Sequence, residues 1–546
     1  MSGTTELTAL RGHAPALHER QDGPILGALG TIRYGGPAPG RGWVARLKIL
    51  LAILGPGLIV MVGDNDAGAF GTYTQAGQDY GLALLWTLPL LIPVLYVNQE
   101  MVLRLGAVSG VGHARLILER FGKFWGAFSV IDLFLLNALT IVTEFIGLNL
   151  AFGFLGIPRL LGVAAAAALI MIAAGTGSFR RFERFSLILV VGSLLLIPVF
   201  LAVHPPLGQI AAHLLVPGLP KGGKLSDVML LIIAIVGTTV APWQLFFQQS
   251  YVIDKRITPR FIPYERADLW IGIGLVMIGA VAMMAFTAAT FAGRPEFGHF
   301  VDAGAVAAGI ARYVGELPGV LFALALIDAC LIGAAAVSLA TAYAVGDVLD
   351  LSHSLHRKPS ESKAFYAVYC GLIGLAAALV LTPGTPLGLL TNAVQSLAGV
   401  LLPSATVFLL LLCNDEAVLG PWVNGRWYNL FTGAVIAALV ILSSILTASV
   451  LFPDIGDGTI LAILVAGGAL AILGWLATGG ARRRASAGTA ANDGLRALWR
   501  MPPLAELPPR RLSRRERLWL IVLRAYLFLA AGLVLARIVM LAVSGA

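Results

Sequence analysis

Charged residues are scarce in this chain. Lys, Arg, Asp and Glu make up 12% of its 546 residues, whereas 58% are hydrophobic. Soluble domains carry about 25% charged residues. The mean hydropathy of +0.86 points the same way. This composition excludes an ordinary soluble protein and predicts an all-α polytopic membrane protein.

Cysteine is scarcer still. Cys330, Cys370 and Cys413 lie in or beside apolar segments at no spacing typical of metal ligands. We expect them to be packing residues rather than a disulfide framework. The apolar segments also lack His-rich clusters and a Gly-x-Ser-x-Gly element, which argues against a membrane-embedded enzyme with its own cofactor.

The chain is rich in apolar runs. Roughly thirteen of them approach the ~20 residues that span a bilayer as a helix. They are residues 44–63, 82–104, 125–153, 159–175, 184–203, 228–251, 269–292, 318–346, 364–382, 388–413, 427–452, 459–478 and 518–543. The last run carries Arg524 and Arg537, so it either spans or lies along the interface.

The net charge of +9 follows the apolar runs, because Lys and Arg gather in every second connection. This bias predicts that the N-terminus and these connections are cytoplasmic, and it indicates a lipid bilayer rather than nucleic acid as the basic surface's partner. Residues 1–42 are polar without a signal peptide, and we expect a disordered cytoplasmic tail there. Residues 479–515 read as a basic cytoplasmic linker. A bacterial inner membrane fits these features.

Two of the apolar runs are interrupted by residues that do not favour helix. The first interruption is Gly63-Asp64-Asn65-Asp66-Ala67-Gly68, and the second is Gly237-Thr238-Thr239-Val240-Ala241-Pro242. Unwound backbone is tolerated at membrane depth only where it faces protein, water or a bound ion. Paired interruptions in two halves indicate a transporter's binding site near the midplane. Two carboxylates in the first interruption predict a cation as cargo.

The interrupted runs are the first and the sixth. We therefore expect two inverted five-helix repeats, over residues 43–204 and 227–414, each opening with a discontinuous helix. Peripheral helices would follow over 427–478, with a C-terminal helix over 516–546.

Polar residues inside the runs have competing interpretations. Asp66 costs about 2.5–3.5 kcal/mol near the bilayer centre, which a bound cation would offset, although it could also cap a half-helix. Asp64 could be a vestibule charge, a capping residue or a charge behind the ligands. Asp328 is either functional or solvated near the outer interface, and Gln248 could line a hydrated path or bond between helices. We expect His353 and His356 to be solvated in a loop.

The motifs resemble those of one family, the Nramp divalent-metal transporters. The likeness covers about residues 45–415 and is most specific in the two interruptions. The matching segments are Gly55-Pro56-Gly57 with Asp66-Ala67-Gly68-Ala69 in the first span, Glu144-Phe145-Ile146-Gly147 in the third, Gly237 to Trp243 in the sixth, and Gln395 with Leu402-Pro403 in the tenth.

The resemblance implies a LeuT-like fold, alternating access, and a metal site at Asp66, at the carbonyls of Gly63 and Thr238, and at Gln395. Two positions depart from the family, since Ala69 and Ala241 replace its asparagine and methionine ligands. Losing the thioether favours harder cations, and Mg²⁺ keeps several waters while touching one or two carboxylates. The chain looks like the Nramp-related magnesium transporters, with Mn²⁺ as a second candidate cargo.

The family's proton pathway is altered as well. Trp243 and Gln248 stand where the family has histidines, and Ile141 replaces an acid, which leaves Glu144. We expect import without strong proton coupling, since about 4.6 kcal/mol is available to a divalent ion at 100 mV. A proton-coupled Mn²⁺ or Fe²⁺ importer is the alternative, and an amino-acid carrier fits poorly because Asp64 and Asp66 would repel a carboxylate.

Overall fold

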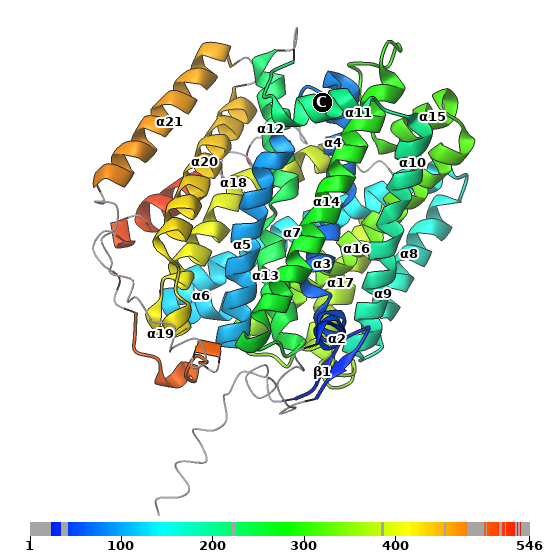
Figure 1. Cartoon of the computed structure of the whole chain (residues 1–546). Coiled ribbons are helices and arrows are strands. Elements are labelled where there is room, and N and C mark those ends of the chain that lie inside the picture. The colour runs from blue at the N-terminus through cyan, green and yellow to red at the C-terminus, as the bar shows by residue number, and fades with distance from the viewer. Residues whose placement is uncertain are drawn as a thin grey trace, which may run out of the picture.

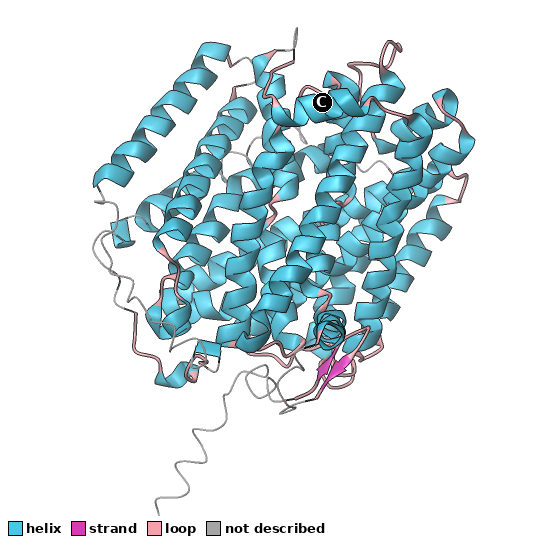
Figure 2. Cartoon of the chain, viewed as in Figure 1, coloured by secondary structure: helices cyan, strands magenta, loops and turns pink. Residues whose placement is uncertain are grey.

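The computed structural model describes residues 23–33, 42–220, 224–383, 387–452, 455–477, 496–497, 499–510, 512, 516–518, 520–529, 532 and 536. Helices make up nearly all of its regular structure (Figure 2). The exception is a hairpin of β1 (Ile25–Leu26) and β2 (Thr31–Ile32), paired antiparallel with Ile25 opposite Ile32. The predicted all-α class is confirmed.

The first repeat begins with an interrupted helix. Its elements are α3 (Pro56–Val62), α4 (Ala67–Tyr80), α5 (Thr87–Ser109), α7 (Lys123–Phe154), α8 (Arg159–Gly175), and α9 (Phe179–Gly192) continued by α10 (Leu196–Val203). A short helix, α2 (Trp43–Ile53), precedes α3 and meets it at a bend of 54°. Another, α6 (His113–Phe121), joins α5 to α7.

The second repeat has the same order. Its elements are α12 (Leu225–Thr239), α13 (Pro242–Asp254), α14 (Ile262–Phe291), α16 (Glu316–Val348), α17 (Lys363–Leu381) and α18 (Leu387–Cys413). Connecting or peripheral helices are α11 (Leu207–Leu215), α15 (Ala303–Tyr313), α19 (Glu416–Leu419), α20 (Arg426–Leu451) and α21 (Asp457–Ala477).

The two interrupted helices run in opposite directions. In Figure 1, α3 lies below α4, whereas α12 lies above α13. The halves pack in matching pairs, α4 against α12 and α3 against α13. The predicted inverted repeats with discontinuous first and sixth spans are therefore confirmed.

Both interruptions are narrower than predicted. The first covers residues 63–66, because α4 already begins at Ala67. The second covers only residues 240–241, since the Val240 N–H still donates to the Val236 carbonyl at 3.0 Å and keeps Gly237 and Thr238 helical. Glycine and threonine are tolerated in a membrane helix when their backbone bonds are kept, so composition overstated the break.

The apolar runs up to 459–478 each coincide with a helix or an interrupted pair. In the described part, 8 helices are long and apolar enough to cross a bilayer alone, or up to 10 if bent pairs count as one. Fewer helices meet this requirement than there are apolar runs in the sequence, partly because α8 and the apolar part of α21 are too short. Of the run 518–543, most residues beyond 529 lie outside the described part.

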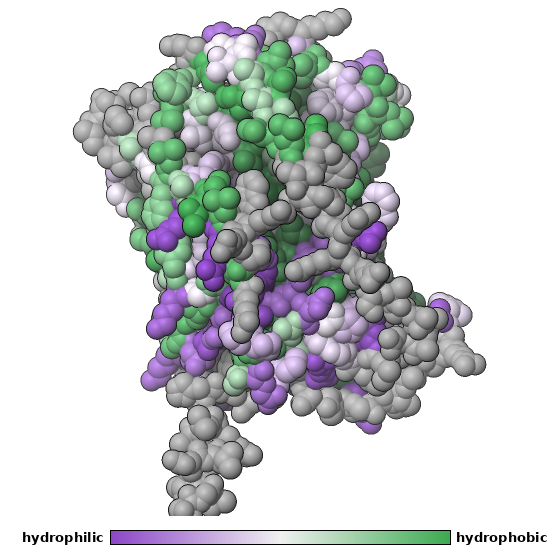
Figure 3. All heavy atoms as spheres, turned by 90° about the vertical axis from the view of Figure 1, so that its left-hand side faces the viewer, coloured by the Kyte–Doolittle hydropathy of each residue, from purple (hydrophilic) through white to green (hydrophobic). Residues whose placement is uncertain are grey.

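The outer surface fits a bilayer. On the face that Figure 3 shows, apolar residues cover the upper and middle parts and hydrophilic residues gather toward the lower end. That lower end carries β1, α2 and α19 (Figure 1). We call it the basic end, since it also holds Arg180, Arg184 and Arg256.

Two segments predicted to be a tail and a linker are partly structured. Residues 23–33 of the tail 1–42 form the hairpin, because buried Ile25 and Ala28 anchor it on the helices. In the linker 479–515, the Met501 N–H donates to the Val108 carbonyl at 3.1 Å. The rest of both segments, apart from Gly42 and short stretches after 495, lies outside the described residues.

Candidate functional site

The two helix interruptions face each other. The hydroxyl of Tyr73 on α4 lies 2.6 Å from the Thr239 hydroxyl, at the end of α12. The Gln244 amide on α13 donates to one carboxylate oxygen of Asp64. A methyl group added at Gly63 would lie 3.5 Å from the Trp243 ring. Contacts between elements of both repeats thus bring the interruptions to one place.

Asp66 begins the half-helix α4. Its side chain accepts a hydrogen bond from the Ala69 N–H at 2.9 Å, and it is 7% exposed. The capping role weighed from the sequence is therefore present. Capping uses one oxygen, Oδ1, so the carboxylate retains acceptor capacity for a cation.

Asp64 is more deeply buried than Asp66, at 1% exposed. Its Oδ1 accepts from Gln244, whereas its Oδ2 is buried with no hydrogen-bond partner among the described residues. It caps no described helix, which removes one of the roles considered. A buried carboxylate oxygen without a donor favours a nearby positive charge.

A third carboxyl group, that of Glu144 on α7, completes the cluster. Its Oε2 accepts from the Ala67 N–H at 3.1 Å, next to Asp66 in the chain. Close approach requires glycine at 333 on α16, where a methyl group would lie 3.0 Å from the Glu144 carboxyl and 3.1 Å from Asp66 Cβ. Sequence alone had left Glu144 without an acidic neighbour.

The backbone adds to the negative character of the site. Both α3 and α12 end at the interruptions, so the negative ends of two helix dipoles point there. Three carboxyl groups and two helix C-termini converge here, offset by the N-termini of α4 and α13. The arrangement suits a cation and disfavours an anion.

The predicted ligand positions differ in what they can offer. Gly63 directly follows α3 and Thr238 lies in the last turn of α12, where a helix end can offer carbonyl oxygens to a cation. Ala69 and Ala241 flank the site with methyl groups only. Gln395 belongs to α18, but its side chain lies outside the described part of the structure.

Two of the accessory residues are buried on α13. Trp243 is 2% exposed and packs edge-on against Phe247, with ring centroids 6.0 Å apart. Gln248 is fully buried, and neither amide atom has a hydrogen-bond partner among the described residues. The interhelical hydrogen bond considered for Gln248 is therefore absent from the described part of the structure, and the hydrated path stays a prediction.

Asp328 lies apart from the carboxyl cluster. It is 8% exposed and faces the end of α9, where a methyl group added at Gly192 would clash with its carboxyl group. Its Oδ2 has no partner among the described residues. The structure thus places it inside the protein and not in a solvated position at the surface.

Sequence reasoning missed a chain of polar side chains that supports Asp64. The Gln99 amide on α5 donates to the Gln244 amide oxygen at 3.0 Å, and Gln244 donates in turn to Asp64. The run Asn98-Gln99-Glu100 inside a predicted span was the available signal, since polar residues at depth call for partners.

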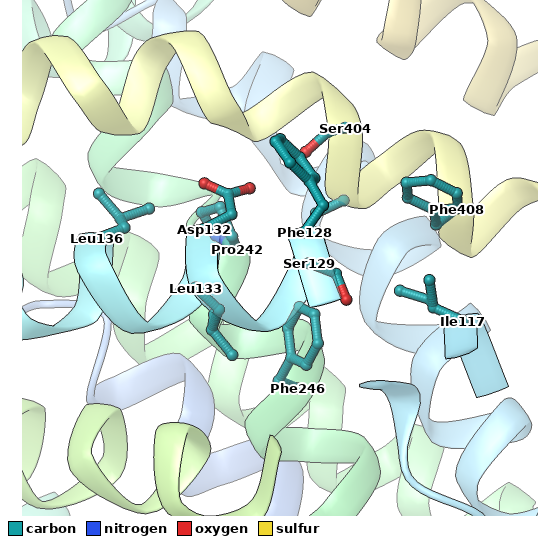
Figure 4. A pocket seen from close by; sticks show the side chains of 11 residues that line it. Ile117, Phe128, Ser129, Asp132, Leu133, Leu136, Pro242, Phe246, Ser404 and Phe408 are labelled. Carbon is teal, nitrogen blue, oxygen red and sulfur yellow. The ribbon is translucent and has the colours of Figure 1, made fainter. Parts of the chain in front are cut away.

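A second missed acid lines a small cavity. Figure 4 shows Asp132 on α7 projecting toward α18, with Ser404 nearby. The cavity of about 10 Å³ also borders Pro242, the first residue of α13. It has room for roughly one water.

His353 contradicts the expectation of a solvated loop residue. It is 3% exposed, and its Nε2 lies 3.0 Å from Asp347 Oδ1. Burial alone would lower the pKa of His353, but the Asp347 carboxylate outweighs burial and raises that pKa above its usual value. The loop after α16 folds back because Asp254 accepts from the Ser354 hydroxyl at 2.7 Å.

Across the ranges that the structure describes, no three or more His, Cys, Asp or Glu side chains are arranged as a metal cluster. The acids at the interruptions are instead spread over the segment between α3 and α4, the N-cap of α4 and the middle of α7. Inverted repeats, paired interruptions and buried acids together define a membrane transporter rather than an enzyme.

The family follows from comparison with known proteins. The model of the "Natural resistance-associated macrophage protein-like" family matches residues 57–449. The chain belongs to this family, Nramp, as its motifs indicated.

Curated relatives and solved structures agree. The chain is 31% identical over 396 residues to the divalent metal cation transporter MntH of Ralstonia nicotianae, covering 69% of this chain and 86% of that one. It is 27% identical over 418 residues to MntH of Burkholderia ambifaria, covering 73% and 89%. The manganese transporter of Eremococcus coleocola has a similar fold, with a TM-score of 0.62 at 20% identity over 80% of this chain and 94% of that one.

Proposed function

We propose that this chain imports a hydrated divalent cation by alternating access, with Mg²⁺ as the preferred cargo and Mn²⁺ as the second. The observation that carries the proposal is the pair of buried acids, Asp64 and Asp66, where the two interruptions meet. Relatives described as divalent metal cation transporters support a divalent cation as the cargo.

The preference for Mg²⁺ rests on the donor set. Ala69 and Ala241 offer neither amide nor sulfur, so the available protein donors are oxygens. Carboxylate, carbonyl and water oxygens suit Mg²⁺ and Mn²⁺ better than softer metals. Methyl groups at two positions also leave coordination sites to water, which Mg²⁺ retains more strongly than other divalent ions.

We further propose that import follows the cation's electrochemical gradient without obligatory proton coupling. Trp243 cannot carry a proton, and neither can Gln248. The basic end would face the cytoplasm of a bacterial inner membrane, where the positive-inside bias and an inside-negative potential favour cation entry.

Proton-coupled Mn²⁺ import is the second candidate, and one contact favours it. The Glu144 carboxyl and Asp66 both approach Gly333, and two buried carboxyl groups this close are most stable when one of them carries a proton. A cation that binds Asp66 would displace that proton. Glu144 then becomes the coupling residue, and a pH change must accompany transport.

The deciding experiment is uptake into proteoliposomes at an imposed inside-negative potential, with a Mg²⁺-sensitive dye and a pH-sensitive dye inside in parallel. We expect saturable Mg²⁺ entry that Asp66→Ala abolishes. Asp328→Asn is the matched control, because it removes a buried acid away from the interruptions and should leave uptake intact. Mn²⁺ entry with acidification and no Mg²⁺ entry would overturn the preference and support proton coupling.

A further inference from the structure

The basic end of α3 is held by an unusually dense set of polar contacts. α3 is the half-helix that leads from the basic end to Gly63, and all of its residues are buried. An alternating-access carrier must open its central site toward one side at a time. Because all of its residues are buried, α3 must move or repack before a path along it can open toward the basic end.

A buried ion pair fixes the junction between α2 and α3. The Lys255 ammonium lies 2.6 Å from Glu183 Oε1, and both side chains are fully buried. Lys255 also donates to the carbonyls of Ile53 at 2.5 Å and Leu54 at 2.9 Å, just before α3 begins. It therefore ties α9 and the end of α13 to the chain that enters α3.

Asp268 on α14 fixes the first turn of α3 from the other side. Its two carboxylate oxygens accept from the N–H groups of Gly55 at 3.1 Å and Gly57 at 2.7 Å. Gly55 has φ of 155°, a conformation that favours glycine, and a side chain there would clash with Glu183. The turn into α3 is thus shaped by these charged groups.

The N-terminal hairpin, residues 23–33, closes over this ion pair. The Ala28 N–H donates to the second oxygen of Glu183 at 2.5 Å. Arg180 on α9 donates to the carbonyls of Gly27 at 3.0 Å and Gly30 at 3.2 Å, and Arg184 donates to that of Ala28 at 3.2 Å. The strands have two residues each, so these contacts rather than a sheet hold the hairpin in place.

We propose that the hairpin and the Glu183–Lys255 pair form a latch that holds α3 closed and must release before a cation leaves the site toward the basic end. The latch rests on the proposed transport function and orientation. Glu183 and Lys255 act as positioning residues, since they contact the backbone around α3 and not the cargo. The hairpin's polar contacts at the protein surface can exchange for water, which makes the closure reversible.

The test measures access to a residue beneath α3. Leu269 on α14 is fully buried, and a methyl group added at Gly57 would lie 2.8 Å from its backbone. A Leu269→Cys reporter is placed in the full chain with Cys330, Cys370 and Cys413 replaced by Ala, reconstituted in nanodiscs. Its reaction rate with a membrane-impermeant thiol reagent reports how often α3 moves away.

Arg180→Ala with Arg184→Ala removes the anchors of the hairpin. We expect the reporter to react about tenfold faster, which corresponds to about 1.4 kcal/mol in the opening equilibrium. Arg181→Ala is the matched control, because this neighbouring arginine is exposed on the same helix. Its reporter should react at the rate of the parent protein.

A second variant guards against misfolding. Deleting residues 1–33 removes the hairpin and leaves in place every helix that the structure describes, and it should accelerate the reporter at least as much as the double substitution. Unchanged rates in both variants, at unchanged melting temperature, would overturn the latch. This readout needs no cation flux, so failure of the proposed transport function would appear separately as absent Mg²⁺ and Mn²⁺ uptake.

Discussion

At the residue scale, Asp64 and Asp66 have different roles in the first interruption. Asp66 caps α4 with one oxygen, whereas Asp64 is aligned by Gln244 and leaves one buried oxygen without a donor. Both carboxylates can therefore face a bound ion, directly or through its waters. Ordinary capping explains part of the Asp66 geometry but none of the Asp64 geometry.

We predict that Asp64→Asn raises the KM for Mg²⁺ by about tenfold, or about 1.4 kcal/mol, while transport persists. The amide keeps the size of the side chain and removes its negative charge beside the ion. Uptake measured over a Mg²⁺ concentration series checks this. An unchanged KM would assign Asp64 to packing alone.

His353 gives a pH-dependent prediction outside the membrane helices. Its pKa is raised in the folded protein by Asp347, so its stabilising contribution is full below the unfolded value of about 6.5. The contribution disappears as the pH rises through the raised folded value. The difference in melting temperature between wild type and His353→Gln should therefore decrease as the pH rises from mildly acidic to alkaline.

The control for this pH series is His213→Gln, since His213 is exposed on α11. Its difference from wild type should stay flat across the same range. A flat difference for His353→Gln as well would mean that the contact with Asp347 does not couple protonation to folding.

Sequence could predict Asp66 because its position shows in the linear pattern, an acid within an apolar run. The support of Asp64 by Gln99 through Gln244 could not be predicted, since it joins two helices and the interruption, whose relative placement is set only by packing. The same holds for Glu144 beside Asp66. Contacts between segments far apart in the sequence depend on tertiary packing, which the residue types alone do not specify.

At the scale of elements, the packing of α3 on α14 depends on small residues. A methyl group at Gly272 would lie 2.7 Å from the Gly57 carbonyl and 2.9 Å from Met61 Cβ. Gly274, two residues further along α14, has open space around it. Two glycines on one helix thus have different roles.

Gly272→Ala should destabilise the protein by about 1–3 kcal/mol through overpacking against α3. Gly274→Ala should stabilise it by about 0.5–1 kcal/mol, because alanine restricts the unfolded chain and favours helix. Thermal unfolding in matched detergent compares the two. Equal effects of the two substitutions would show that α3 shifts freely to accommodate a methyl group.

At this scale the apolar runs predicted the helices with which they coincide, because the length of an apolar run is a local property of the sequence. It misjudged the width of the second interruption, because Gly237 and Thr238 keep helical bonds in context. It also missed the hairpin, whose two-residue strands are held by arginines from a distant helix. Such an element has no periodic signal of its own.

At the scale of the whole molecule, a cargo that binds where both repeats meet should stabilise the folded state. Mg²⁺ at one hundred times its Kd should add about 2.7 kcal/mol of stability. Asp66→Ala should remove this gain while leaving the apo protein folded. Melting temperatures with and without Mg²⁺ measure both effects, and an undiminished gain in the variant would place Mg²⁺ elsewhere.

The docked hairpin also constrains how this protein can be handled in the laboratory. An affinity tag or fluorescent fusion joined directly to residue 23 would adjoin the hairpin that contacts Arg180 and Glu183, where a bulky or charged attachment competes with native contacts. Activity assays on N-terminally tagged material would then report the attachment as well as the transporter. Purification handles belong at the opposite terminus.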